Sequence, residues 1–446
     1  MNAPKLQAPQ LKAPQRRRLL FGAFALSWLW PLRHAMAAAG KPQQINVLTA
    51  YPNEVMSSFE QAFEKAHPQY RLNFLWRMPH DALPYLREHA HDGSVDVYWS
   101  ASPRTFDRLK EEKLLRKLGN ARSRNLPETI GKTRITDIDG YFAATEIAGY
   151  VFAINDARLK ALDVVEPQDW TDLANPRLAG QIALPVPSSV GFAPVMFDIV
   201  LQAWGWEKGW ALWSEIAALS QLAQSGSTFI TDTVGSGQAA IGLSMDFFVR
   251  AAIAKGAALT QRYPAHNGIN PGQIALPAVS GNARGAKAFV DFVLSEAGQK
   301  LLLERDIRKL PVRPSVYPHN DGSQFNPFFA ARKGMLDYDG ERGRWRLAVI
   351  SAIFDEMLAK PHKEIVELWQ RVHAAEAAGK DVAAVRATLC KPPVDEALAD
   401  SDEVRRRFRN DLEGETLPHR DLLQQWSLSC AFERAKARGA LSAIDA

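Results

Sequence analysis

The segment YFAATEIAGYVFAIN, residues 141–155, decides the fold that this sequence predicts. It is rich in aromatic and β-branched residues, which favour strands. It is also far longer than an average strand of about five or six residues. A strand of this length can cross from one lobe of a protein to another. We therefore expect two lobes that are joined at this segment.

The chain before this segment alternates between strand and helix patterns. Strands are expected at residues 44–51, 70–76 and 95–101. Helical spacing of apolar residues fills the intervals, with Asn53 as a candidate N-cap and with Pro84 interrupting the second helix. Ser102 opens the third helix and Pro103 takes its first position. This alternation predicts a parallel α/β sheet.

The chain after the segment continues the α/β pattern and then changes. We expect a helix whose first turn carries Ser188 and Ser189, a short helix and a strand within residues 227–245, and a returning strand at 268–280. Strand signals stop near residue 324. The expected fold class is therefore α/β, with two lobes and a helical C-terminal extension. The expected boundaries are 44–145 with 265–323 for the first lobe, 146–264 for the second lobe and 324–446 for the extension.

The N-terminus carries the features of an export signal. Three arginines, Arg16, Arg17 and Arg18, precede an apolar run at residues 19–30 that is short for a membrane span. Paired arginines in this place are typical of a twin-arginine signal, and small residues at 35–39 offer cleavage sites. We expect residues 1–39 to be removed and the mature protein to be periplasmic. The alternative is an uncleaved membrane anchor.

Composition and charge exclude some partner classes. A net charge of +5 over 446 residues is small, and 46% hydrophobic with 23% charged residues is ordinary for a soluble globular protein. The run Arg405, Arg406 and Arg407 lies among acidic residues, so we interpret it as a solvated helix face and expect no nucleic-acid partner. The cysteines are Cys390 and Cys430. In an oxidising compartment they either form one disulfide or remain free.

The sequence contains none of the common catalytic or cofactor motifs. There is no G-x-S-x-G, P-loop, H-E-x-x-H or G-x-G-x-x-G motif. The glycines at 235 and 237 precede a strand, so they form a turn and not a phosphate-binding loop. His80, His89 and His91 lie on surface-like helical sequence and form no metal set. We expect neither an enzyme nor a bound cofactor or metal.

Several segments together resemble a known family. They are LTAYPNEVMSSFEQAFEKAHPQY, SVDVYWSASPRTFDRLKEEKLL, TDLANPRLAGQIALP and GINPGQIALPAVSGNARGAKAFVDFVLSEAGQKLL. These segments resemble the periplasmic solute-binding proteins of ABC importers, in the branch that includes the ferric-iron binders. With SASP, GWEKGW and KLPVRPSVYP, the chain looks most like the phosphoglycerate-transport regulatory proteins of the periplasm. The resemblance implies the type II fold, with two crossing strands and a ligand between the lobes.

Small hydroxyl-bearing and amide residues follow the predicted strands. In open α/β sheets, ligands lie outside the carboxyl ends of strands, where helix N-termini present N–H groups. The alternative is plain helix capping, which contributes about 1 kcal/mol for each residue. The candidate ligand-binding residues at these ends are Tyr51, Asn53, Ser100, Ser102, Ser188, Ser189, Ser227 and Thr228.

A second group of candidates follows the strand at 241–245. The iron binders that the chain resembles carry adjacent tyrosines where this chain has Phe247 and Phe248. Phenyl rings offer no oxygen to Fe(III), so this difference counts against iron. We expect the rings to line the ligand site. Asp246 either binds a hydroxyl or ammonium group, orients a neighbour, or caps the following helix.

An anionic ligand would suit helix N-termini and an arginine. The candidate anion contacts are Arg77, Arg104 and Arg262. Our first hypothesis is a monomer that captures a small phosphorylated or carboxylated solute for an ABC permease in the inner membrane. The alternative is a ligand-sensing partner of a membrane histidine kinase that regulates phosphoglycerate uptake. A periplasmic assembly factor with a vestigial site is the third hypothesis.

Overall fold

The computed structural model describes residues 41–119, 126–224, 227–317, 325–343, 345–409 and 419–445. Residues 42–446 cluster as one compact unit. The predicted export signal lies outside the described residues. Within the described ranges, no helix has the length and apolar character that crossing a membrane requires.

The N-terminal half of the sheet is a parallel α/β layer, which we call lobe 1. Its strands β1 (Gln43–Thr49), β2 (Tyr70–Trp76) and β3 (Val97–Ser100) pair in the order β2-β1-β3. Helices α1 (Asn53–Ala66), α2 (Pro79–Glu88) and α3 (Pro103–Glu111) connect or follow them. The helix α1 buries Val55, Phe59 and Phe63, which recur every four residues on one face.

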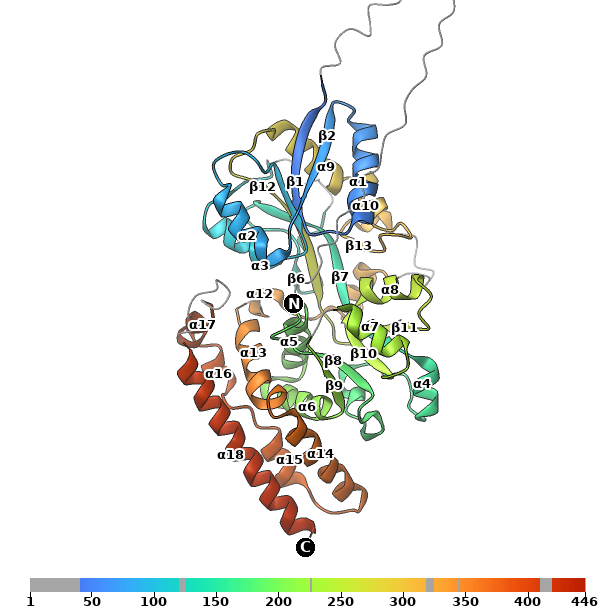
Figure 1. Ribbon diagram of the computed structural model, residues 1–446, viewed down its shortest axis with the longest axis vertical. Coiled ribbons are helices and arrows are strands. Elements are labelled where there is room, and N and C mark those ends of the chain that lie inside the picture. Colours follow the sequence, from blue (N-terminus) through green and yellow to red (C-terminus); the bar gives the residue numbers. More distant parts are fainter. Residues whose placement is uncertain are drawn as a thin grey trace, which may run out of the picture. The chain divides into compact units, whose positions relative to one another are not determined.

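Strand β7 (Phe142–Ile154) crosses between two parts of the sheet, as its length predicted (Figure 1). Its first half pairs antiparallel with β12 (Ile269–Pro277), which in turn pairs with β3. Its second half pairs antiparallel with β10 (Ile241–Met245). Every residue of β7 is buried. The two-lobed α/β fold with crossing strands is therefore confirmed.

The second part of the sheet, which we call lobe 2, is again parallel. Strand β10 pairs with β8 (Ile182–Pro185), which pairs with β9 (Ser220–Ala223). Helices α5 (Ala193–Trp204), α6 (Trp206–Ala218), α7 (Ser227–Gly235) and α8 (Asp246–Ala254) belong to this lobe. The shorter elements before β12 are β4 (Leu115–Arg116), β5 (Thr129–Ile130), β6 (Thr133–Arg134), α4 (Asp156–Ala161) and β11 (Thr260–Arg262). After β12 come α9 (Ala283–Leu294), α10 (Glu296–Leu301) and β13 (Leu310–Pro311).

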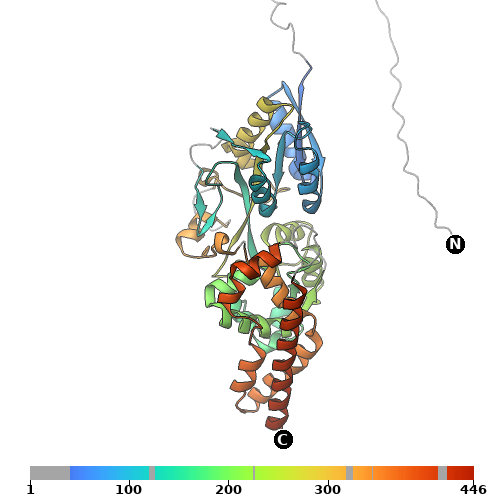
Figure 2. The same cartoon turned by 90° about the vertical axis from the view of Figure 1, so that its left-hand side faces the viewer.

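The C-terminal extension is helical, as expected, and α18 runs alongside α14 and α15 in both views (Figures 1 and 2). Its elements are α11 (Pro327–Arg332), α12 (Gly340–Gly343), α13 (Leu347–Phe354), the π-helical turn η5 (Asp355–Ala359), α14 (His362–Ala377), α15 (Ala383–Leu389), α16 (Glu396–Ala399), α17 (Asp402–Arg409) and α18 (Arg420–Asp445). Its core is continuous with that of lobe 2. One buried cluster joins Phe197 and Trp213 of lobe 2 with Phe354, Trp369 and Trp426 of the extension.

Polar contacts reinforce this shared core. The indole of Trp206 donates to the backbone carbonyl of Val394 at 2.9 Å, and the hydroxyl of Ser214 donates to the backbone carbonyl of Leu389 at 3.0 Å. Lobe 1 has separate clusters around Phe59 and Tyr98. Lobe 2 and the extension therefore form one packed body. The boundaries given above for the lobes and the extension stay a prediction.

Two local expectations differ from the structure. Pro52, not Asn53, is the N-cap of α1, and Asn53 is the first helical residue. Ser188 and Ser189 lie in a turn ahead of α5, which begins at Ala193. Pro194 explains this later start, because a proline without an N–H fits the first turn of a helix.

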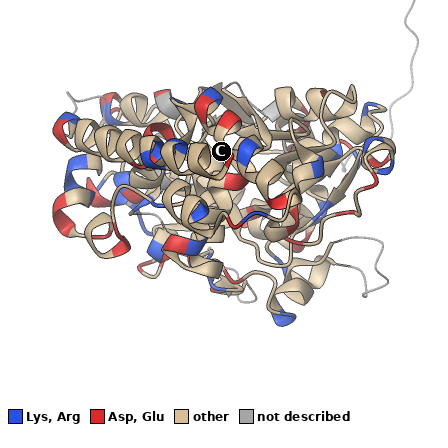
Figure 3. Cartoon of the chain, turned by 90° about the horizontal axis from the view of Figure 1, so that it is seen from below, with Lys and Arg blue, Asp and Glu red and all other residues tan. Residues whose placement is uncertain are grey.

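The structure also shows whether the cysteines are paired and what the arginine run contacts. Cys390 and Cys430 are free, so the disulfide alternative is not realised in the structure. Arg405 and Arg407 form ion pairs with Asp400 and Glu403. Figure 3 shows Lys and Arg residues mixed with Asp and Glu residues over the molecule as it is seen from below, and not gathered by sign.

Candidate functional site

The carboxyl ends of the strands of both lobes meet at the crossing segment. In lobe 1, Ser100 at the end of β3 lies opposite Gln273 of β12. In lobe 2, Met245 at the end of β10 lies opposite Tyr150 of β7. Both partner residues lie where their strands enter the lobe. The two edges that bind ligands in open α/β sheets therefore face the same stretch of β7 and β12.

A β-bulge re-aims two polar side chains of β7 at this stretch. The pairing of β7 with β12 shifts between Gly272 and Gln273, so Thr145 is an extra residue beside Glu146. Bulges change the direction of side chains and are frequent beside functional sites. Here the hydroxyl of Thr145 donates to Glu146, and the indole of Trp99 donates to the Thr145 hydroxyl at 2.9 Å.

Tyr51 closes this network from the β1–α1 turn. Its phenol donates to Glu146, and burial together with the negative charge of Glu146 raises the pKa of Tyr51 well above its ordinary value. Tyr51 therefore remains a neutral donor. Gly272 lies against both groups, and a Cβ at this position would overlap the Glu146 carboxylate and the Tyr51 hydroxyl.

Lys309 is the cation of this buried cluster. Its ammonium lies 3.3 Å from Glu146 Oε1, and both side chains are under 10% exposed. The ammonium also lies 4.7 Å from the ring centre of Tyr51 and 4.9 Å from that of Phe247. Cation–π attraction of this kind is stronger where water is excluded. Lys309 thus contacts an aromatic ring from each lobe.

Asp246 has its charge balanced within lobe 2. Its Oδ2 lies 2.9 Å from Arg250 Nη2 and accepts a hydrogen bond of 2.7 Å from the Tyr263 hydroxyl. Burial and the charge of Asp246 raise the pKa of Tyr263 well above its ordinary value. Asp246 makes no side-chain cap, because Met245 is the N-cap of α8. The pairing with Arg250 removes most of the repulsion between Asp246 and an anionic ligand.

Some buried polar atoms near the crossing remain without a partner. Within the described ranges, no hydrogen bond reaches Gln273 Oε1 of β12, Ser244 Oγ of β10 or Asp246 Oδ1. Buried polar groups are nearly always paired with protein or water. Two of these unpaired atoms lie on strands at the crossing and the third lies at the start of α8, which is consistent with a bound solute or ordered water.

The predicted hydroxyl residues divide into two groups. Tyr51 and Ser100 lie at the crossing. Burial raises the pKa of the neighbouring Tyr98 phenol above its ordinary value, and the Ser100 hydroxyl acts in the opposite direction. Ser102 is the N-cap of α3, and its hydroxyl contacts Thr105 Oγ1 at 2.9 Å. Ser188 instead donates to Asp355 of the extension at 2.9 Å.

The other predicted residues are not gathered into one cluster. Asn53, Ser189 and Thr228 are exposed at the starts of α1 and α7 and ahead of α5, and Ser227 begins α7. Arg77 lies with its guanidinium 4.8 Å from the ring centre of Tyr85.

The remaining two arginines give little support to the prediction that they contact an anionic ligand. Arg262 pairs with Glu166 at 2.5 Å. Arg104 is the second residue of α3, and its side chain lies outside the described part.

Sequence reasoning missed a cation beside Lys309. Arg308 adopts a left-handed backbone conformation with φ of 51°, and its Nη1 lies 3.5 Å from the carbonyl oxygen of Arg250 on α8. No carboxylate of the described residues forms an ion pair with it. Glu146, Lys309, Arg250 and Tyr263 were also missed. Glu146 carried a usable signal, because it is the lone charged residue in an apolar strand.

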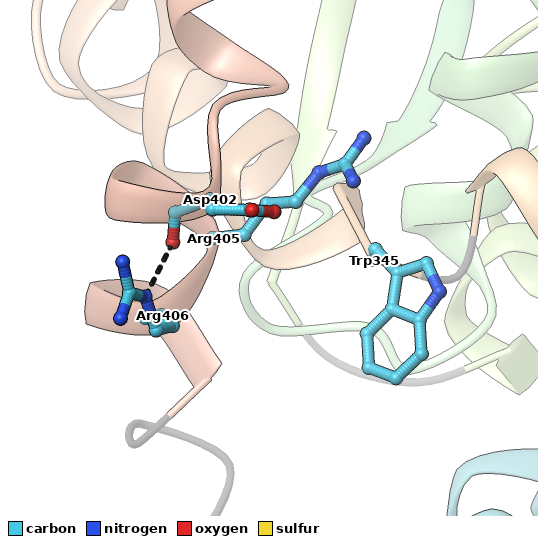
Figure 4. Close-up of a pocket in the computed structure, with 4 residues that line it drawn as sticks. All are labelled: Trp345, Asp402, Arg405 and Arg406. Carbon is cyan, nitrogen blue, oxygen red and sulfur yellow. Dashed lines mark hydrogen bonds between the residues drawn. The ribbon is translucent and has the colours of Figure 1, made fainter.

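A separate hollow of about 500 Å³ lies on the extension (Figure 4). It is lined by Trp345, Asp402, Arg405 and Arg406. The guanidinium of Arg406 turns to the backbone carbonyl of Asp402, and Arg405 pairs with Asp400. These side chains do not converge on one point. We therefore place the candidate site at the crossing and not here.

Comparison with known families gives one match over more than half of the chain. Residues 92–327 match the model of a bacterial extracellular solute-binding protein. This range covers β7, β12, lobe 2 and the Arg308–Lys309 turn.

In the described ranges, no cluster of three or more His, Cys, Asp or Glu side chains is arranged to hold a metal ion.

Curated relatives extend the similarity. The phosphoglycerate transport regulatory protein PgtC of Salmonella typhimurium is 25% identical over 336 residues, which cover 74% of this chain and 81% of that protein. An uncharacterised protein of Haemophilus influenzae is 26% identical over 253 residues, which cover 56% of this chain and 71% of that protein.

Solved structures show the same fold. The periplasmic binding protein AfuA of Actinobacillus pleuropneumoniae, with exogenous fructose-6-phosphate bound, matches with a TM-score of 0.56 and 22% identity. Iron-bound HitA of Pseudomonas aeruginosa matches with a TM-score of 0.55 and 18% identity. Each match covers 70% of this chain and 98% of the other protein.

Proposed function

The chain belongs to the family of bacterial extracellular solute-binding proteins, and from this we propose that it captures a small phosphorylated or carboxylated solute at the crossing of β7 and β12. It then delivers this solute to an ABC importer in the inner membrane. The predicted twin-arginine signal would export it to the periplasm. Closure of two lobes around a solute is the usual motion of such folds.

The observation that carries the proposal is the position of Arg308. Its guanidinium is a cation without a carboxylate partner among the described residues, whereas Lys309 and Arg250 beside it are neutralised by Glu146 and Asp246. A left-handed conformation at a non-glycine residue costs on the order of 1–3 kcal/mol and recurs at ligand sites. Arginine binds carboxylate and phosphate with two parallel hydrogen bonds.

Two similar proteins are associated with a phosphate-bearing compound. PgtC is a phosphoglycerate transport regulatory protein, and AfuA holds exogenous fructose-6-phosphate. Both compounds carry a phosphate, which supports an anionic ligand. The N-termini of α1, α3, α7 and α8 follow strands at the same two edges and offer N–H groups to such an anion.

A thermal-shift assay on ligand-stripped mature protein tests the proposal. The probes are 3-phosphoglycerate, glucose 6-phosphate, inorganic phosphate and Fe(III). A probe at about a hundred times its dissociation constant should add roughly 2.7 kcal/mol of stability. Arg308→Gln should abolish the shift, and the control Arg262→Gln should keep it. A shift with Fe(III) alone would contradict the proposal, and no shift with any probe would favour an assembly factor.

The alternative function is signal input to a membrane sensor kinase. It is favoured by the packing of the extension, because a movement of lobe 2 carries the outer surface of α18 with it. That surface exposes Leu428 and Phe432. Deleting the extension would open the core of lobe 2, so Phe432→Glu is the better test. If solute uptake survives but induction of the transporter is lost, the sensor function is supported. If both survive, it is excluded for this surface.

A further inference from the structure

We propose that the ligand carries a ring or another flat apolar face besides its anionic group, and that this face lies on Phe192 and Phe248. The inference rests on the proposed function, because it concerns the same site. It narrows the ligand class from small acids in general to cyclic phosphates or carboxylates. A short acyclic acid would leave these rings uncovered.

Three phenyl rings form a row at the carboxyl edge of lobe 2. Phe247 and Phe248 are the second and third residues of α8, and their ring centres are 3.9 Å apart. Phe192 is the N-cap of α5, and its ring centre is 6.0 Å from that of Phe248. All three side chains are half-buried, with one side on the core of lobe 2. Lys309 lies over the ring of Phe247, and the other sides of Phe192 and Phe248 are left to water or to a ligand.

The row begins at the cations of the site. Lys309 lies over the ring of Phe247, and Arg308 precedes it and contacts α8. A ligand whose anionic group pairs with Arg308 therefore has phenyl rings next to the rest of its body. Pairing of aromatic faces contributes about 0.5–1.5 kcal/mol beyond the area that it buries.

Calorimetric titration of the stripped protein tests this inference. The probes are 3-phosphoglycerate as the acyclic acid, and glucose 6-phosphate and phenyl phosphate as the ring compounds. The variants are Phe248→Ala and Phe248→Leu, the second of which keeps an apolar group on the core if the first fails to fold. The control is Phe229→Ala, which removes an exposed phenylalanine of α7 outside this row.

We expect at least one ring probe to bind at least tenfold more tightly than 3-phosphoglycerate. Both Phe248 variants should remove that advantage, and Phe229→Ala should keep it. If 3-phosphoglycerate binds as tightly as the ring probes, or if Phe248→Leu leaves their affinities unchanged, this inference is overturned while the proposed function stands. If no probe binds, both are overturned.

Discussion

Arg346 of the extension and Asp198 of α5 form an ion pair with a distance of 2.5 Å between Nη2 and Oδ1, and neither side chain is exposed. Arg346 also pairs with Glu396 at 2.8 Å. Burial tends to lower the pKa of Arg346, but the charge of Asp198 outweighs burial and raises it. This pair fixes the extension to lobe 2 from within.

Removal of one partner of this pair should therefore be costly. Arg346→Met leaves Asp198 as an uncompensated buried carboxylate, and such losses typically cost about 3–5 kcal/mol. Urea denaturation measures the change in the free energy of unfolding. The matched control is Arg371→Met, which removes an ion pair with Asp445 on the surface and should cost about 1 kcal/mol or less. Equal losses for the two variants would refute a special role for the buried pair.

Gly272 should not accept a side chain. A methyl group there would overlap Glu146 and Tyr51, so Gly272→Ala should lower stability by about 1–3 kcal/mol. It should also weaken solute binding at least tenfold, measured by titration. Gly191→Ala is the control, because a Cβ at Gly191 meets no atom within 4 Å. Unchanged binding in Gly272→Ala would show that the network does not support the site.

The contact between α6 and the extension should be sensitive to acid. Burial raises the pKa of Glu215, but hydrogen bonds from His373 and Arg386 outweigh this and lower it below its ordinary value. A carboxyl group whose pKa is lower in the folded protein stabilises the fold at pH values above its unfolded pKa of about 4.3. This stabilisation is lost as the pH falls through the pKa of the folded protein.

We therefore expect the free energy of unfolding to decrease below about pH 5. Glu215→Gln should show a smaller decrease over the range from pH 7 to pH 3, measured by urea denaturation. Glu304→Gln, at an exposed position, serves as the control. The explanation fails if Glu215→Gln and the unmodified protein lose stability equally with acid.

The two cysteines should be unreactive in the folded protein. Burial raises the pKa of the thiols of Cys390 and Cys430 to about 12 in each case. Because the thiolate is the reactive form, a thiol reagent should label neither quickly at neutral pH. After unfolding without reductant, two thiols for each chain should react. If none reacts until a reductant is added, the cysteines form a disulfide in solution.

The fold was predictable where local pattern and global structure agree. The length and composition of β7 predicted a crossing strand, and the alternation of strands and helices predicted the parallel sheets. Single-residue boundaries were less predictable. Asn53 is a better cap by propensity, yet Pro52 occupies the N-cap position.

The site was predictable only where it depends on strand ends. Asp246 follows β10 directly and Tyr51 lies two residues after the end of β1, so their positions could be inferred. The direction of Glu146 depends on a bulge that requires the partner strand, and the position of Arg308 depends on its left-handed backbone and its contact with α8. Such non-local pairings leave little trace in a single sequence.

The joint interior of lobe 2 and the extension also bears on how the protein can be expressed. The match to AfuA spans 98% of that protein but 70% of this chain, so the two-lobed fold exists with less polypeptide. In this chain, however, the side of α6 that carries Trp206 and Ser214 is covered by the extension. A truncated protein that lacks these helices would expose that apolar side to water and would tend to aggregate.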